Sequence, residues 1–285
     1  MHFSKIFVFL ILLLLSSQCA PSVSELKTIP FPDAYSLADF QKIILTDDME
    51  EISGIEWVGE DQLWAIEDES SIIYKLDTET GKILKKRKFS KNKDIEDLEV
   101  VNEVAWVLQS NGTLYEVTSP LSKNANTTEH HFPIKEKRDI EAIVASETEP
   151  FLFVFCKVCK WDIGPDQASI FRFDLMNKSY DSIPFKTLKR DQIQPLLRDK
   201  KAELLDIQPS AAAFHPIEKQ FYILSSSGKW LLITDSDFIP KDVFRLDSRL
   251  FKQPEGLAFD PHGNMYISNE AQDGEANILK FVYTP

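Results

Sequence analysis

Five short stretches repeat one phrase along the chain, and this repeat decides the fold. They read Ile52-Ser53-Gly54-Ile55, Ile95-Glu96-Asp97-Leu98, Ile140-Glu141-Ala142-Ile143, Pro209-Ser210-Ala211-Ala212 and Pro254-Glu255-Gly256-Leu257. The second positions of successive phrases are 43, 45, 69 and 45 residues apart. A strand led by an aromatic residue follows each phrase, with the aromatic 10 to 12 residues after the second position, at Trp64, Trp106, Phe153, Tyr222 and Tyr266. Two spacings that agree in five places indicate a true internal repeat.

Each repeat has room for several short strands. A third strand is expected after each aromatic-led strand, and a fourth after most of them, for example at 83–89 and 243–246. Turn-rich segments such as 77–81 and 260–264 separate these apolar or alternating runs. Four strands in a unit of 40 to 50 residues are typical of a β-propeller blade. The sequence therefore predicts an all-β protein in which residues 40–285 form a single five-bladed β-propeller.

Closure of the ring requires a strand from the beginning of the chain. The fifth unit holds three strands before Pro285, and the apolar segment Phe40 to Leu45 has no unit of its own. We expect this segment to supply the outer strand of blade five, which would remove an exposed sheet edge. The alternative is a six-bladed propeller in which residues 28–46 belong to a partial sixth blade.

The long spacing between the third and fourth phrases indicates an insertion. The excess maps to Thr187 to Leu205, where Leu188, Ile193 and Leu197 are among leucines and isoleucines spaced as in a helix. We expect a helical insertion between blades three and four, on one rim of the propeller. It would either contribute to a functional face or cover the junction between the blades passively.

The N-terminus has the features of an export signal. A charged start with Lys5 precedes an apolar run from Ile6 to Leu15, which is too short for a good membrane span. The following Ser16-Ser17-Gln18-Cys19 resembles a bacterial lipobox, although Ser16 stands where Leu is usual. The sequence thus predicts a signal peptide at 1–18, acylation of Cys19 and a tether at 19–39. The protein would be exported and held by this lipid at a membrane of the bacterial cell envelope, at the outer membrane or facing the periplasm; the alternative is an ordinary cleaved signal with a chance cysteine.

Composition excludes several other classes. Apolar residues make up 43% of the chain, which is enough for a large core and excludes wholesale disorder. The 45 acidic and 32 basic residues give a net charge of −13, so we expect no nucleic-acid partner. We expect a monomer.

The phrases also carry a family resemblance. Glu51–Ile55, Asp94–Glu99 and the stretch from Pro254 to Glu270 resemble the SdiA-regulated (YjiK-type) β-propellers, and the resemblance covers roughly residues 40–285. It implies an exported, membrane-associated propeller without a settled biochemical activity; some relatives are linked to calcium, and a phytase-like role has been suggested. The chain departs from the family in Cys156-Lys157-Val158-Cys159 and in Ser210-Ala211-Ala212-Ala213. The second departure weakens the transfer of a ligand role to blade four.

The repeats place polar side chains at one mouth of the central channel. The innermost strand of each propeller blade lines this channel, so the second positions of the phrases should form a ring. We predict Glu96, Glu141 and Glu255 as metal ligands, and Ser53, Ser210, Glu67, Asp68, Asn269 and Glu270 as ligand-binding residues. Converging carboxylates must take up protons, meet a basic partner or bind a cation. Their oxygen atoms suit Ca²⁺ or Mg²⁺, so calcium is the expected cofactor; the alternative is a water-filled channel without a fixed ion.

No motif in the chain indicates an enzyme. A Gly-x-Ser-x-Gly elbow and a phosphate-binding glycine loop are absent from the sequence. Cys156 and Cys159 are expected to form a local disulfide or to remain two thiols. We therefore expect a lipid-anchored propeller that binds a small molecule, a protein or Ca²⁺ at the channel mouth. A Ca²⁺-dependent hydrolase, phytase-like or esterase-like, is one alternative, for which Lys157 is the one base in the mouth layer; a structural or adhesive envelope component is another.

Overall fold

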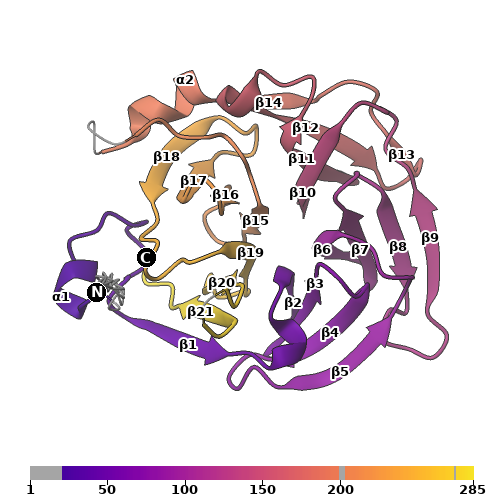
Figure 1. Cartoon of the computed structure of the whole chain (residues 1–285), viewed down its shortest axis with the longest axis horizontal. Helices are drawn as coiled ribbons and strands as arrows, with labels where there is room; N and C mark the ends of the chain where they lie inside the picture. The colour runs from indigo at the N-terminus through magenta and orange to yellow at the C-terminus, as the bar shows by residue number, and fades with distance from the viewer. Residues whose placement is uncertain (1–20, 199–202, 273) are drawn as a thin grey trace, which may run out of the picture.

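The computed structural model describes residues 21–198, 203–272 and 274–285, and it confirms the five-bladed propeller. The predicted signal peptide and Cys19 lie outside the described residues. Figure 1, viewed along the propeller axis, shows the five sheets arranged around a centre that is lined by β2, β6, β10, β15 and β19.

The blades follow one another along the chain. Blade one contains β2 (Ile52–Gly59), β3 (Gln62–Glu67), β4 (Ile72–Asp77) and β5 (Ile83–Lys88). Blade two contains β6 (Ile95–Val101), β7 (Val104–Gln109), β8 (Leu114–Thr118) and β9 (Asn126–His130). Blade three contains β10 (Arg138–Ala145), β11 (Phe151–Cys159), β12 (Gln167–Asp174), β13 (Ser179–Tyr180) and β14 (Lys186–Lys189), with η2 (Gly164–Asp166) before β12. Blade four contains β15 (Ala211–His215), β16 (Gln220–Ser225), β17 (Trp230–Thr234) and β18 (Pro240–Arg245).

Blade five is completed from both ends of the chain, as predicted. It contains β19 (Pro254–Phe259), β20 (Met265–Asn269), β21 (Asn277–Phe281) and β1 (Phe40–Ile44). β1 pairs antiparallel with β21, from Phe40 opposite Phe281 to Ile44 opposite Asn277. This pairing closes the ring, and the described residues do not support the six-bladed alternative.

The core lies between the blades. The middle strands are buried on both faces, as in β17, where every residue is buried, because each sheet packs against two neighbours. Outer strands face solvent, and β5, with the sequence ILKKRK, is largely exposed. This gradient explains why the sequence pattern is clearest in the inner strands of each blade and weakest in the outer ones.

The insertion between blades three and four is less helical than predicted. α2 (Arg190–Ile193) and η3 (Gln194–Leu196) are its helical turns, whereas β14 before them is a strand. β14 pairs with the first half of β12, and β13 pairs with the second half, so both lie along one edge of blade three. Leu188, Ile193 and Leu197 are buried in the apolar cluster between blades three and four. The spacing of these apolar residues therefore reflects their burial, in a segment that is partly strand and partly helix.

The segment before β1 packs on the propeller. α1 (Val23–Leu26) begins with a capping box between Ser22 and Glu25, and η1 (Asp47–Met49) precedes β2. Phe31 and Leu37 are buried with Leu26 in the cluster between blades four and five. Much of the segment predicted as a tether, 19–39, thus covers this cluster. No helix among the described residues combines the length and apolar character needed to cross a membrane.

One buried hydrogen-bond network fixes this N-terminal segment. His215 Nδ1 accepts from the amides of Ile217 (3.2 Å) and Glu218 (3.0 Å), which places the ring proton on Nε2. Nε2 then donates to the Tyr35 hydroxyl at 2.7 Å, and Tyr35 donates to the Gly263 carbonyl at 2.6 Å. Burial lowers the pKa of His215, in keeping with a neutral ring.

Candidate ligand-binding mouth of the central channel

The three predicted metal-binding glutamates share one backbone irregularity. In blade two, Ile95 lies opposite Gln109 and Asp97 opposite Leu108, so Glu96 is an extra residue in its strand. Glu141 and Glu255 are extra residues in the same way in blades three and five. A β-bulge re-aims the side chain of the extra residue. In blades two, three and five the phrase is therefore a β-bulge that directs its second position away from the sheet.

Small residues at the third phrase position, in every blade except blade two, allow the inner strands to converge. The third phrase positions are Gly54, Asp97, Ala142, Ala211 and Gly256. A Cβ at Gly54 would lie 2.5 Å from Asp97 Oδ1 and 2.8 Å from Asp97 Cα in blade two. Asp97 is itself buried, and its Oδ2 accepts from the Ile143 amide of blade three at 2.9 Å. These contacts connect blades one, two and three at the mouth.

The mouth carries a closed ring of acidic side chains. Burial, with repulsion from Glu141 and Asp94, raises the pKa of Glu96 to about 9. Burial also raises the pKa of Glu141 to about 8, and Glu255 contributes by repulsion. The glutamates of successive blades thus repel one another.

The ring continues through blades five and one. Burial, together with repulsion from Glu255 and Asp68, raises the pKa of Glu270 to about 8. Burial and neighbouring acids, Asp94 among them, raise the pKa of Asp68 to about 7. Because Asp94 also repels Glu96, mutual repulsion links these acids from blade to blade around the mouth. The structure thus brings together Glu96, Glu141, Glu255, Glu270 and Asp68, in addition to Asp94.

Two lysines partly compensate this charge. Lys157 Nζ forms an ion pair with Glu141, and the carboxylates of Glu141 and Glu255 outweigh the effect of burial and raise the lysine pKa. Lys229, in the turn between β16 and β17, has its pKa lowered by burial, against the attraction of Glu255 and Glu270. The acids outnumber these bases, so the mouth favours protons or added positive charge.

The predicted serines have local partners. Ser53 Oγ donates to the Ile95 carbonyl at 3.0 Å and Ser210 Oγ to the Pro254 carbonyl at 3.2 Å. Both bonds join neighbouring blades, and both side chains are buried. Ser53 and Ser210 thus have a structural role in joining the blades, and their hydroxyl groups already have partners.

The other predicted ligand residues differ in their contacts. Glu67 accepts from the Glu69 amide at 3.0 Å, within its own turn. Asn269 is buried beside Asn277, and its Oδ1 atom has no hydrogen-bond partner among the described residues. Asp68 Oδ1 is likewise buried without such a partner. A buried acceptor of this kind calls for a donor or a cation.

Sequence reasoning missed an outer acidic layer. Glu51, Asp94 and Asp139 each lie two residues before the second phrase position, and Gln208 and Gln253 occupy the equivalent places in blades four and five. Glu51 repels Asp68 and Glu270, and Asp139 repels Glu96. The repeat itself held this signal, since all five positions are acids or their amides. Lys229 was also missed, and no repeated pattern marks it.

The donor set fits a hard cation, but the spacing is wide. Carboxylate oxygens are the ligands that Ca²⁺ takes. Among the described residues, the one group of three or more potential ligand atoms within 4.8 Å of one another is Cys156, Cys159 and Asp162. A cation at the mouth would therefore be held by Glu96, Glu141 and Glu255 through water or after small side-chain movements.

Cys156 and Cys159 form a disulfide, one of the two alternatives derived from the sequence. The pair lies at the end of β11, directly around Lys157. It thus braces the backbone that carries the mouth lysine.

The fold and the mouth define a five-bladed propeller with an acidic central channel. The family model described as SdiA-regulated matches residues 175–272, which confirms the resemblance noted in the sequence for this part of the chain. No curated protein sequence matches the chain.

Solved propellers share the architecture. A luciferin-regenerating enzyme superposes with a TM-score of 0.51 at 10% identity, covering 85% of this chain and 95% of that one. Glutaminyl cyclase of Myxococcus xanthus gives 0.57 at 8% identity, covering 85% and 93%. A protein of unknown function from Bacteroides thetaiotaomicron VPI-5482 gives 0.50 at 14% identity, covering 84% of this chain and 60% of that one. At these identities the likeness shows the fold alone.

Proposed function

We propose that this protein is a binding propeller whose acidic channel mouth takes up a positively charged ligand, with Ca²⁺ as the simplest candidate. The closed ring of carboxylates with raised pKa values carries this proposal. A divalent cation would relieve their repulsion and satisfy the buried Asp68 Oδ1 atom.

A binding role is better supported than hydrolysis of phosphate esters. Such a hydrolase needs cations that are free to meet the phosphate, whereas Lys157 is paired with Glu141 and the surrounding groups are acidic. A small organic or protein ligand with an amine would be recognised by the same charges as Ca²⁺.

We also propose that the chain is exported and held at a membrane of the bacterial cell envelope through a lipid on Cys19. The lipobox-like Ser16–Cys19 after the apolar run supports this part. Replacing Cys19 by Ala should move the protein from the membrane fraction to the soluble fraction, and unchanged fractionation would contradict the anchor.

The cation is tested by thermal unfolding of residues 21–285, which contain all five sheets and both strands of the closing pair. A ligand that binds the folded state alone stabilises it by about 2.7 kcal/mol at a hundredfold excess over Kd. We expect Ca²⁺ to raise the midpoint relative to chelator, and Glu255→Gln or Glu141→Gln to abolish most of the rise.

The matched control is Glu79→Gln, an exposed acid in the turn after β4, which should leave the rise intact. Equal midpoints with Ca²⁺ and with chelator would refute cation binding. A rise that survives both mouth substitutions would place the ion elsewhere.

A further inference from the structure

A second pocket lies between blades one and two, at the end of the propeller opposite the acidic mouth. It has a volume of about 910 Å³ and is lined by the end of β2, the start of β3, the turn between β6 and β7, and the loop between β8 and β9. The phrases lie at the other ends of these inner strands, so the pocket is separate from the mouth. We refer to it as the Trp64 pocket.

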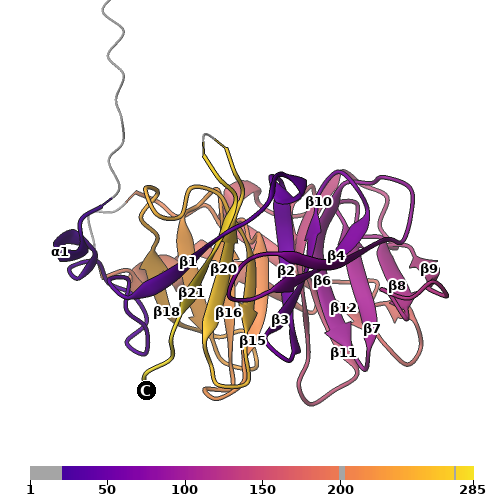
Figure 2. The same ribbon diagram turned by 90° about the horizontal axis from the view of Figure 1, so that it is seen from below.

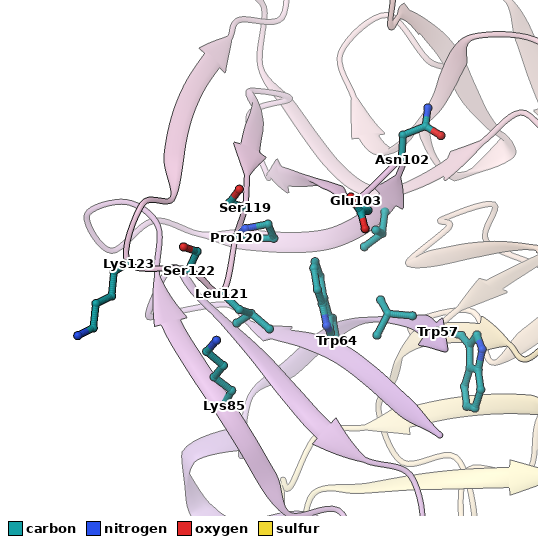
Figure 3. Close-up of a pocket in the computed structure, with 12 residues that line it drawn as sticks. Trp57, Trp64, Lys85, Asn102, Glu103, Ser119, Pro120, Leu121, Ser122 and Lys123 are labelled. Carbon is teal, nitrogen blue, oxygen red and sulfur yellow. The ribbon is translucent and has the colours of Figure 1, made fainter. Parts of the chain in front are cut away.

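The wall of this pocket is aromatic and aliphatic. Figure 3 shows Trp64 beside Leu121, and Val100 also lines the pocket. The ring of Trp57 lies apart from them and stacks on Tyr266 of blade five. The indole Nε1 of Trp64 is buried and has no hydrogen-bond partner among the described residues. Because this atom is closed to solvent, a ligand in the pocket would meet the ring of Trp64 and not its N–H.

Cations gather at the edge of the pocket, although the protein has a net charge of −13. Lys85 and Lys123 line it, and Arg87 Nη2 donates to the Lys123 carbonyl at 3.4 Å. Lys85 and Arg87 project from one face of β5 because side chains alternate along a strand. Lys86, between them, projects from the other face and pairs with Asp48 at 2.6 Å.

We propose that the Trp64 pocket binds a small organic anion with a flat apolar body, such as an aromatic carboxylate or sulfonate. The ring would pack on Trp64 and Leu121, and the anionic group would lie near Lys85. Pockets that combine an apolar wall with a few placed polar groups are typical small-molecule sites. Glu103 is the one acid among the lining residues, and it repels an anion, so the anionic group would lie at the Lys85 edge of the pocket, across Trp64 from Glu103 (Figure 3).

The test uses 8-anilinonaphthalene-1-sulfonate, an aromatic anion that fluoresces in apolar surroundings, with folded residues 21–285. We expect saturable binding near one site per chain. Lys85→Gln should weaken it about tenfold, as expected for loss of a charged contact, while Lys86→Gln on the same strand should not change it. Trp64→Leu, which keeps an apolar side chain but removes the flat ring, should weaken binding about fivefold.

Two further arms decide the identity of the site and of the ligand. Glu255→Gln should leave dye binding unchanged, because the mouth is at the other end; a loss there would assign the dye to the mouth and overturn the proposal. 2-Naphthoate should displace the dye better than dodecanoate, and the opposite order would refute a flat body. Absence of binding, or equal affinities of the Lys85 and Lys86 variants, would also overturn it.

Discussion

The acidic mouth should make the protein less stable as pH rises, and Glu270 is the best residue for testing this. Its side chain is 8% exposed, and burial with repulsion from Glu255 raises its pKa to about 8. An acid whose folded pKa exceeds its unfolded value of 4.5 holds its proton more tightly when folded. Its stabilising contribution is complete below pH 4.5 and is lost as pH rises through 8.

The magnitude of this loss of stability follows from the pKa shift of Glu270. Each pKa unit corresponds to about 1.4 kcal/mol, so the Glu270 contribution to the free energy of unfolding should fall by about 4 kcal/mol between pH 5 and pH 9. Part of this fall is shared with the other ring acids, since removal of one charge lowers the pKa of its neighbours. We therefore expect Glu270→Gln to flatten the pH dependence by about 2 to 4 kcal/mol.

The measurement is urea unfolding of residues 21–285 at pH values from 5 to 9 without divalent cations. The difference between wild type and variant isolates the mouth, because all other titrating groups are common to both. Glu79→Gln is the control and should follow the wild-type curve. Parallel curves for wild type and Glu270→Gln, or a wild-type stability that increases up to pH 9, would refute the buried ring.

Three further substitutions, each followed by urea unfolding, test contacts of the mouth and of the N-terminal segment. Gly54→Ala places a Cβ against the blade-two backbone and should cost about 2 kcal/mol, whereas Gly274→Ala, where the backbone leaves room, should be near neutral. Tyr35→Phe removes the hydroxyl that accepts from His215 and donates to the Gly263 carbonyl, and this loss should cost about 1 to 3 kcal/mol. Lys157→Gln leaves Glu141 without a counter-charge and should cost about 2 kcal/mol at pH 9. The cost should be smaller at pH 5, where Glu141 is protonated. Lys160→Gln, at an exposed position, is the control and should have little effect at either pH.

Much of the fold was predictable because the propeller repeats local patterns. The phrase and the aromatic-led strand recur with a fixed offset, and the unmatched segment from Phe40 implied the closing strand that pairs with β21. The insertion was harder, since spacing such as Leu188, Ile193 and Leu197 fits either a helix or a folded cover. The pairing of β14 with β12 decides between these, and it depends on contacts that a local pattern does not encode.

The mouth was predictable only where the repeat carries it. Glu96, Glu141 and Glu255 share a phrase position, and their convergence follows from the rotation between blades. The bulge that aims them and the local bonds of Ser53 and Ser210 required backbone geometry. Lys229 reaches the site from a turn with positive φ in a single blade, so no comparison between repeats could find it.

The N-terminal segment relates the proposed anchor to the two proposed sites. Pro21 lines a small pocket with Asn269 and Glu275, beside the connection between β20 and β21. Figure 2 shows this connection at the upper face, with the C-terminus at the lower face. Cys19 is two residues before Pro21, a span of at most about 7 Å.

We propose that a lipid on Cys19 would hold the acidic mouth toward the bilayer and leave the Trp64 pocket on the outer face. An anionic membrane surface repels an acidic mouth and attracts cations. A divalent cation in the ring would reduce that repulsion where the anchor makes it strongest. In this proposal Ca²⁺ would offset the charge of the carboxylates where they face the membrane, while the anion pocket would be open to solutes on the opposite side.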